Sequence, residues 1–334
     1  MAIACKCSRA NIEDVRPSIL ITKRLVPESL VDSLTAQADV DYERTDDGLT
    51  PDRLIARARG KDVLITQVTD RFSRPMLEAI APKLIAQLAV GYDNIDLPAA
   101  TERGIMISNT PGAVTESTAD LAFGLMLATA RRIAEGHRYI HQGQWKRWTL
   151  DLMLGTDVHG RTLGILGMGQ IGLAMARRAA GFGMRVIYNN RKPAANLTTA
   201  EWVSKEQLLR EADFLSIHVP LNAETRHMIG EAELRAMKPE AILINASRGP
   251  VVDEPALARA LQENWIAGAG IDVFESEPQI HPALLACPTA VLTPHIGGAS
   301  VQAREKMAAI VRDNVIAYIE GRRPPNLLNP QLWV

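Results

Sequence analysis

Thr162-Leu-Gly-Ile-Leu-Gly167-Met-Gly169-Gln-Ile-Gly172 is the stretch that decides the fold of this chain. An apolar strand that runs into Gly-x-Gly-x-x-Gly and then into a helix is typical of a dinucleotide-binding unit. Gly167 allows the tight turn, Gly169 lets a pyrophosphate approach the backbone, and Gly172 lets helix and strand pack closely. An ordinary tight turn is the alternative. The second apolar strand that follows, at 184–189, favours nucleotide binding.

The end of that second strand bears on which nucleotide binds. A site for NAD usually places Asp or Glu about 20 residues beyond the glycines, where it accepts from the ribose hydroxyls. Here the run is Tyr188-Asn-Asn190-Arg191-Lys192, with no acid and two cations. Because Arg can clamp a 2′-phosphate that an acid would repel, Asn190 and Arg191 predict a preference for NADPH, with NADH as the second cofactor. The alternative is a solvated basic turn.

Short apolar runs alternate with helix-length amphipathic segments along the whole chain. This alternation predicts an α/β fold of parallel sheets with helices on both faces. The expected strands are Ile19–Thr22, Val63–Gln67, Leu84–Val90, Ile105–Ser108, Leu163–Leu166, Val186–Asn189, Phe214–Val219, Ile242–Ala246, Gly268–Val273 and Val291–Thr293. The expected helices are Glu28–Ala36, Asp52–Ala58, Glu116–His141, Ile171–Gly181, Lys205–Glu211, Pro255–Glu263 and Val301–Glu320.

The composition excludes several classes of protein. The 334 residues carry a net charge of -1 and only 4% aromatic residues, so we expect no binding to nucleic acid or to an anionic membrane. No apolar run reaches the length of a membrane span. Three cysteines, Cys5, Cys7 and Cys287, make neither a disulfide framework nor a metal site, and they indicate a reducing compartment. We therefore expect a cytoplasmic protein without a metal, whose residues 1–16 form a loose N-terminal tail.

Three charged side chains follow the carboxyl ends of expected strands, where open α/β sheets bind their ligands. They are Arg248, Glu277 and His295. Such a set suits the reduction of a 2-oxo acid: Arg binds the carboxylate, His supplies a proton, and Glu holds the His cationic and oriented. Taken singly, each residue is better explained by a structural role: a helix-capping ion pair, an acid of a surface turn or a structural histidine.

The sequence resembles the D-isomer-specific 2-hydroxyacid dehydrogenases from about Ile19 to Asn329. Six motifs in the order of that family carry the resemblance. They are Val90-Gly-Tyr-Asp-Asn-Ile-Asp96, Asn109-Thr-Pro-Gly112 with Thr115-Glu116, Gly167–Gly172, Asn245-Ala-Ser-Arg-Gly249 with Val252-Asp-Glu254, Gly270-Ile-Asp-Val-Phe274 with Glu277-Pro278, and Pro294-His-Ile-Gly-Gly298.

The resemblance implies two doubly wound parallel-sheet domains, with a Rossmann nucleotide domain inserted into a flavodoxin-like substrate domain. Residues 109–299 would form the dinucleotide-binding domain, and residues 17–108 with 300–334 the substrate domain. The active site would lie in the cleft between them. The backbone N–H groups of Val90 and Gly91 would help Arg248 to hold the substrate carboxylate.

The resemblance also assigns roles within the nucleotide domain. His295 would donate a proton to the carbonyl oxygen while Glu277 stabilises the imidazolium; Glu275 is the alternative acid, but the family places its carboxylate next to the proline. Asp272 would face the carboxamide of the nicotinamide. The expected cofactor contacts are Thr115, Gly167, Met168, Gly169, Gln170, Ile171, Asn190, Arg191, Val219, Pro220, Thr225, Ala246, Asp272 and Gly298.

Within the family, Ala89-Val-Gly91 and the turn at 188–191 look like glyoxylate and hydroxypyruvate reductases. The expected substrate is therefore a small 2-oxo acid. The alternatives are a phosphoglycerate or other D-2-hydroxyacid dehydrogenase, a formate or phosphonate dehydrogenase, and a nucleotide-sensing binding protein of the corepressor kind. An almost wholly apolar run at Leu121–Ala130, with Trp145 and Trp148 after it, predicts a homodimer; burial of the run in the protein's own core is the alternative.

Overall fold

The computed structural model describes residues 16–195 and 197–333. Most of the expected N-terminal tail, with Cys5 and Cys7, lies outside the described residues. The described chain divides into two compact units. Unit 1 holds the residues up to Pro111 together with those from Glu305 onwards, and unit 2 runs from Gly112 to Arg304. No helix in the described part of the chain is both long and apolar enough to cross a membrane.

Unit 1 contains a five-stranded parallel sheet with strand order β2-β1-β3-β4-β5. This is the flavodoxin-like order of doubly wound folds. Apart from the edge strand β2, its strands are buried, mainly apolar runs, as a sheet covered on both faces requires. The strands are β1 (Ser18–Ile21), β2 (Asp39–Tyr42), β3 (Val63–Thr66), β4 (Leu84–Gln87) and β5 (Met106–Ser108).

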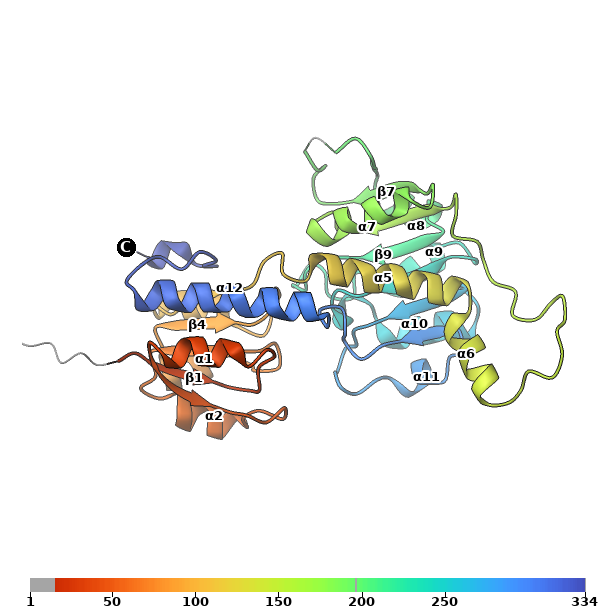
Figure 1. The fold of residues 1–334 in the computed structure, drawn as a ribbon. Coiled ribbons are helices and arrows are strands. Elements are labelled where there is room, and N and C mark those ends of the chain that lie inside the picture. Colours follow the sequence, from red (N-terminus) through yellow and green to blue (C-terminus); the bar gives the residue numbers. More distant parts are fainter. Residues whose placement is uncertain (1–15, 196, 334) are drawn as a thin grey trace, which may run out of the picture. The chain divides into compact units, whose positions relative to one another are not determined.

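Helices cover both faces of this sheet (Figure 1). Apolar side chains of α2, α3 and α4 form one core with strand residues such as Leu20 and Leu64, whose neighbours in the strands face the opposite side. On that opposite side lie α1 and the unit 1 part of α12. The helices are α1 (Ser29–Thr35), α2 (Pro51–Ala58), α3 (Arg74–Ile80), α4 (Leu97–Glu102) and α12 (Val301–Ile319), followed by a short 3₁₀ turn, η2 (Pro330–Leu332).

Unit 2 contains a seven-stranded parallel sheet with strand order β12-β11-β10-β9-β6-β7-β8. Counted from its own first strand, this is the Rossmann order 3-2-1-4-5-6 with one further strand. The strands are β6 (Thr162–Leu166), β7 (Arg185–Asn189), β8 (Glu201–Trp202), β9 (Phe214–Ile217), β10 (Ile242–Asn245), β11 (Gly268–Ile271) and β12 (Ala290–Leu292).

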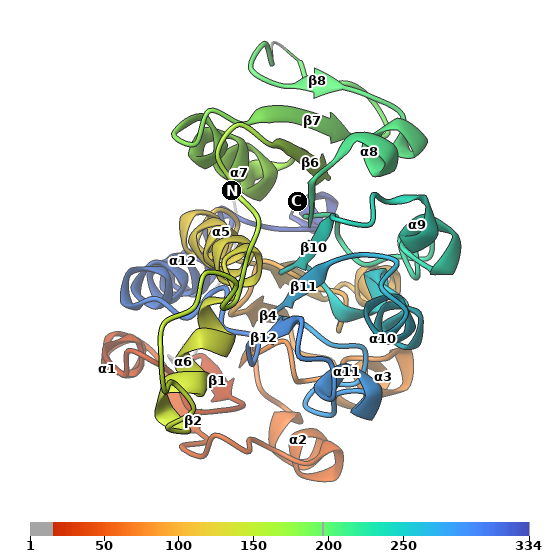
Figure 2. The same cartoon turned by 90° about the vertical axis from the view of Figure 1, so that its right-hand side faces the viewer.

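Two helix layers enclose the sheet of unit 2 (Figure 2). Helices α5 and α7 pack on one face, and α8, α9, α10 and α11 lie on the other. Together the two units confirm the predicted α/β fold of two doubly wound parallel sheets. The helices of unit 2 are α5 (Thr115–Ala130), α6 (Ile133–His141), α7 (Gln170–Ala180), α8 (Lys205–Glu211), α9 (Glu231–Ala236), α10 (Glu254–Gln262) and α11 (Pro282–Leu285), with a 3₁₀ turn η1 (Gly249–Val251).

The structure differs from the expected elements in three ways. The expected single helix Glu116–His141 is broken, because Arg132 adopts a left-handed φ of 53° between α5 and α6. The strands β2 and β8 were not expected. Both are partly exposed edge strands, and charged residues interrupt the apolar runs by which a strand is recognised. The short helices α3, α4, α9 and α11 were also missed.

Candidate active site

The glycine-rich turn joins β6 to α7, and each glycine has a different spatial reason. Gly167 has a φ of 100°, and a β-carbon added there would lie 2.8 Å from the carbonyl of His218. A β-carbon on Gly172 would overlap the backbone oxygen of Gly167. At Gly169, apart from its two chain neighbours, no atom of the described residues lies within 4 Å of an added β-carbon, so a ligand has room to approach the backbone. This turn at the N-terminus of an eleven-residue helix fits a pyrophosphate.

The turn after β7 is hydrogen-bonded to the glycine-rich turn. The side-chain oxygen of Asn190 accepts a hydrogen bond from the backbone N–H of Met168 at 2.7 Å. Asn190 is therefore a support of the turn in this structure. The side chain of Arg191 is 91% exposed, and its guanidinium lies 3.9 Å from the carboxylate of Glu224. At that distance in water the pair contributes little, so the arginine is available to a charged ligand.

The remaining expected cofactor residues lie along the carboxyl edge of the sheet. Thr115 opens α5, and its hydroxyl donates to the side-chain oxygen of Gln170, the first residue of α7, at 3.3 Å. Thr225 is buried and donates to the backbone oxygen of Pro220 at 2.6 Å, which fixes the loop after β9. The other members of the set in this unit lie at the glycine turn or just beyond strand ends: Ile171, Val219, Ala246 and Gly298.

Asp272 organises the segment that carries His295. Asp272 is 1% exposed, and its two carboxylate oxygens accept from the N–H groups of Ile296 and Gly297, both at 2.8 Å, and from the hydroxyl of Thr293 at 2.6 Å. The backbone N–H of His295 also donates to the backbone oxygen of Asp272 at 2.9 Å. The turn after β12 is thereby fixed to the end of β11.

Glu277 and His295 are in direct contact. Nδ1 of His295 lies 2.8 Å from Oε2 of Glu277, while Oε1 of Glu277 accepts from the backbone N–H of Phe274 at 2.9 Å. Burial alone would raise the pKa of Glu277, but the hydrogen bonds from His295 and Phe274 and the charges of His295 and Arg248 bring that pKa below its ordinary value. An ionised carboxylate only accepts, so Nδ1 carries the hydrogen and Nε2 remains for a ligand.

Arg248 is brought to the same edge by its neighbours. The side chain of Asn245, the last residue of β10, donates to the backbone oxygen of Arg248 at 3.0 Å. Gly249 follows, and a β-carbon there would overlap the backbone oxygen of Phe274 and lie 2.6 Å from the N of Glu275. Only glycine allows the two turns to approach so closely. Arg248 is thus held beside the turn that carries Glu277.

The alternative acid, Glu275, has different partners. Its Oε1 lies 3.0 Å from Nε2 of His227 and accepts from the backbone N–H of Glu254 at 2.9 Å. The structure therefore pairs His295 with Glu277 and not with Glu275.

The sequence assigned no role to His218, and it named Asn245 and Gly249 only as members of a motif, although Asn245 binds the backbone of Arg248 and Gly249 allows two turns to meet. His218 follows β9, and its Nε2 lies 2.8 Å from the hydroxyl of Ser216. Only their positions at or just after the ends of strands could have identified these residues in the sequence. The last two expected substrate contacts, Val90 and Gly91, follow β4 and belong to unit 1.

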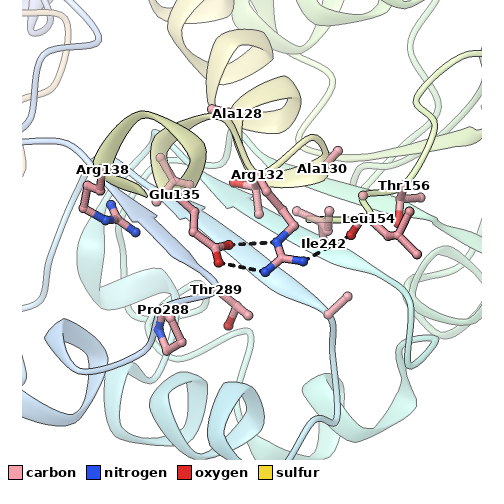
Figure 3. Close-up of a pocket in the computed structure, with 14 residues that line it drawn as sticks. Ala128, Ala130, Arg132, Glu135, Arg138, Leu154, Thr156, Ile242, Pro288 and Thr289 are labelled. Atoms are coloured by element: carbon pink, nitrogen blue, oxygen red, sulfur yellow. Dashed lines mark hydrogen bonds and ion pairs between the residues drawn. The ribbon is translucent and has the colours of Figure 1, made fainter. Parts of the chain in front are cut away.

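A cavity of about 310 Å³ lies away from these residues, at the opposite edge of the same sheet. It is lined by Ile242, the first residue of β10, and by Thr289 and Val291 at the beginning of β12. Arg132 donates to both carboxylate oxygens of Glu135 at 2.7 Å in this cavity (Figure 3). It is distinct from the candidate active site, which follows the carboxyl ends of the strands.

Comparisons with known proteins show which family the chain is similar to. Residues 123–297 match the family model of the D-isomer specific 2-hydroxyacid dehydrogenase, NAD binding domain. The chain is 50% identical over 326 residues to the glyoxylate reductase of Thermococcus litoralis, covering 94% of this chain and 97% of that protein. The corresponding values for the glyoxylate reductase of Korarchaeum cryptofilum are 48% identity and coverages of 95% and 97%.

Among solved structures, the chain is similar to an NADPH-dependent glyoxylate/hydroxypyruvate reductase from Sinorhizobium meliloti in complex with NADP and malonate. The TM-score is 0.86 at 33% identity, and the match covers 94% of this chain and 97% of the other.

Proposed function

The chain belongs to the D-isomer-specific 2-hydroxyacid dehydrogenase family, and from that membership we propose that it reduces glyoxylate or hydroxypyruvate with NADPH as the preferred reductant. The product is the 2-hydroxy acid, in the D configuration where it is chiral. The observation that carries the proposal is the 2.8 Å contact between His295 and an ionised Glu277, next to the turn of Arg248.

The proposed roles follow from the chemistry of each group. When bound, the reduced nicotinamide supplies the hydride that adds to the 2-oxo carbon. Arg248 holds the substrate carboxylate, with help from the backbone N–H groups of Val90 and Gly91. His295 donates the proton on Nε2 to the carbonyl oxygen, and its Nδ1–H remains bonded to Glu277. The carbon thus gains a hydride and the oxygen a proton, and a neutral imidazole is left.

A spectrophotometric assay of NADPH oxidation tests the substrate. We expect turnover with glyoxylate and hydroxypyruvate to exceed that with pyruvate or 2-ketogluconate. An enzyme that acts only on a phosphorylated substrate would support the phosphoglycerate alternative. A chain that binds NADPH but reduces none of these acids would reject the proposal in favour of a binding protein.

The preference for NADPH rests on Arg191, which is exposed at the end of β7 where no acid is present. One lost charge-assisted contact is worth roughly 1.5–3 kcal/mol, so Arg191→Ala should weaken NADPH binding about ten- to a hundred-fold. NADH binding should be unchanged. Arg210→Ala, on the exposed side of α8, is a matched control. Equal catalytic efficiency with both cofactors in the parent enzyme would contradict this preference.

We also propose that the chain forms a homodimer. The run Leu121–Ala130 no longer supports this, because Phe123, Leu125 and Met126 belong to the core of unit 2. The support comes from α6 and the segment that follows it, where large apolar side chains are exposed.

A further inference from the structure

The segment after β4 is held by hydrogen bonds to its backbone carbonyl groups. The side-chain Nδ2 of Asn109 donates to the oxygen of Val90 at 2.8 Å, and the backbone N–H of Thr110 donates to the oxygen of Ala89 at 2.9 Å. Asn109 is only 7% exposed. Two consecutive peptide groups are therefore fixed from one side, by one short stretch of chain after β5.

This arrangement determines the direction of two N–H groups. In a trans peptide the carbonyl and the N–H of the next residue point in opposite directions. Because the carbonyls of Ala89 and Val90 face the stretch 109–110, the N–H groups of Val90 and Gly91 face away from it. Two neighbouring N–H groups on the same side are suited to the two oxygens of a carboxylate.

The next peptide group is fixed as well, by a buried network of side-chain amides. Nε2 of Gln87 donates to Oδ1 of Asn94 at 2.8 Å and to the oxygen of Gly91 at 3.4 Å. Asn94 in turn donates to the oxygen of Asp70 at 2.6 Å, and Thr66 donates to Gln87 at 2.7 Å. The segment is thus tied to the loop after β3.

We propose that Asn109 is a positioning residue for substrate binding, which sets the peptide plane between Val90 and Gly91 so that its N–H meets the substrate carboxylate. This proposal rests on the proposed function. Asn109 contacts neither the substrate nor the cofactor in this role. It acts through the oxygen of Val90, whereas the network around Gln87 limits the movement of the segment on the other side.

Steady-state kinetics of two variants tests the role. Asn109→Ala removes the donor and the volume, and Asn109→Leu removes the donor but keeps roughly the volume. One hydrogen bond is worth about 0.5–1.5 kcal/mol, so both variants should raise the KM for glyoxylate roughly 3- to 10-fold. Because the carboxylate is bound in both the ground state and the transition state, kcat should change by less than about 2-fold. The Kd of NADPH should not change.

Asn329→Ala is the matched control. Asn329 is a buried asparagine of the same unit, 2% exposed, which accepts from the N–H of Ile107 and donates to the oxygen of Ile105, both at 2.9 Å. Its loss should lower the stability of the unit without changing KM under conditions in which the variant is folded.

Each other outcome overturns the proposal. An unchanged KM in both Asn109 variants would reject the positioning role. A raised KM in Asn109→Ala alone would show that volume matters and the donor does not. An equal rise in Asn329→Ala would show that KM reports general loosening of the unit. A parent enzyme that binds NADPH and reduces no 2-oxo acid would reject the proposed function itself, which is a separate result from the variant comparison.

Discussion

The backbone of His295 adopts a φ of 52°, a left-handed conformation that a non-glycine residue rarely takes. Such a conformation costs on the order of 1–3 kcal/mol and persists only where the surroundings impose it. Here the carboxylate of Asp272 imposes it through the N–H groups of Ile296 and Gly297. The ring is therefore aimed by the backbone, and Glu277 fixes its rotation about the remaining bonds.

Replacing Glu277 by Gln should change the pH dependence of reduction. The neutral amide can still accept from Nδ1 of His295, but it no longer stabilises a positive charge on the ring. The lowered pKa of Glu277 shows that its carboxylate and the charge of His295 stabilise each other, so without that carboxylate the activity profile should move towards acidic pH. The loss in kcat at pH 7.5 should lie between roughly 10-fold and the 10²–10⁴-fold that we expect for His295→Ala.

Glu275→Gln is the control for this measurement, because Glu275 lies two residues away and contacts His227 instead. Its profile should match that of the parent enzyme. If the profile of Glu277→Gln did not move, Glu277 would only hold the ring in place.

His218 is only partly exposed and the Nδ1 of its ring is buried, which leads to a prediction about stability. Burial lowers the pKa of His218 to about 4 from an ordinary value near 6.5. Between these values the unfolded chain binds the proton and the folded chain does not, so stability falls as the pH drops from about 6.5 to about 4. The loss over the whole window is at most about 3 kcal/mol, and none of it remains above pH 7.

Urea unfolding at pH 7.5 and pH 5.0 measures this effect. The parent should lose about 2 kcal/mol more than His218→Gln between the two pH values, because only the parent carries a group with this shift. Equal losses would mean that His218 is protonated in the folded protein.

At the scale of elements, the contact between two turns depends on Gly249. The turn after β10 and the turn after β11 approach so closely that a β-carbon at Gly249 would overlap the backbone of Phe274. Because both partners are backbone, one turn must move. We expect Gly249→Ala to cost about 2–3 kcal/mol of stability and to lower kcat/KM roughly 100-fold, since Arg248 is displaced from the turn of Glu277.

Gly181→Ala serves as the control for this variant. Gly181 has an ordinary helical φ of -65° at the end of α7, and its nearest neighbour for an added β-carbon is at 3.4 Å. This change should stabilise by about 0.4–1 kcal/mol and leave activity unchanged. Unfolding curves and initial rates of both variants make the comparison; full activity in Gly249→Ala would show that the two turns act independently.

The existence of an element could be predicted from the sequence where one physical property, such as a continuous apolar run, determines it. Buried strands such as β6 and β10 are continuous apolar runs, and their existence could be predicted from the sequence. The break between α5 and α6 could not, because Arg132 has a side chain for which a left-handed φ is unusual and no glycine or proline marks the position. The edge strand β2 contains two aspartates, so its pattern was that of a loop.

In the candidate site, too, some residues could be predicted from the sequence and others could not. Arg248, Glu277 and His295 could be proposed from residue type and position after a strand. Their supports could not, because Asn245 or Asp272 becomes recognisable as a holder of a turn only when the hydrogen bonds are known.

At the scale of the whole molecule, the two units share one principle. Each is a parallel sheet with its candidate ligand-binding residues after the carboxyl ends of strands: Val90 and Gly91 in unit 1, and Arg248, Glu277 and His295 in unit 2. Strands and helices alternate in the same way in both units. The alternation alone therefore does not indicate where one sheet ends and the next begins. The resemblance to a family supplied the discontinuous arrangement.

Two copies of this chain are expected to associate through α6 and the segment after it. Six of the thirteen large apolar side chains that are exposed among the described residues lie between Ile133 and Leu154, on α6 and the segment after it. Trp148 is 71% exposed and Leu150 83%. A contiguous stretch of this kind is typical of an interface, because water-exposed apolar surface of this extent is unfavourable in a monomer. Leu154 also lines the cavity beside Arg132, so the exposed stretch borders that cavity.

We therefore expect light scattering at micromolar concentration to give twice the chain mass of 36.5 kDa. Placing charges in the exposed stretch, as in Trp148→Glu with Leu150→Asp, should shift the mass towards one chain, because a buried unpaired charge costs several kcal/mol at an interface. Leu285→Glu removes an apolar side chain that is 59% exposed on α11, outside this stretch, and should leave the mass unchanged. A parent protein that has the mass of one chain would contradict the dimer, and an effect of Leu285→Glu equal to that of the double variant would move the interface away from α6.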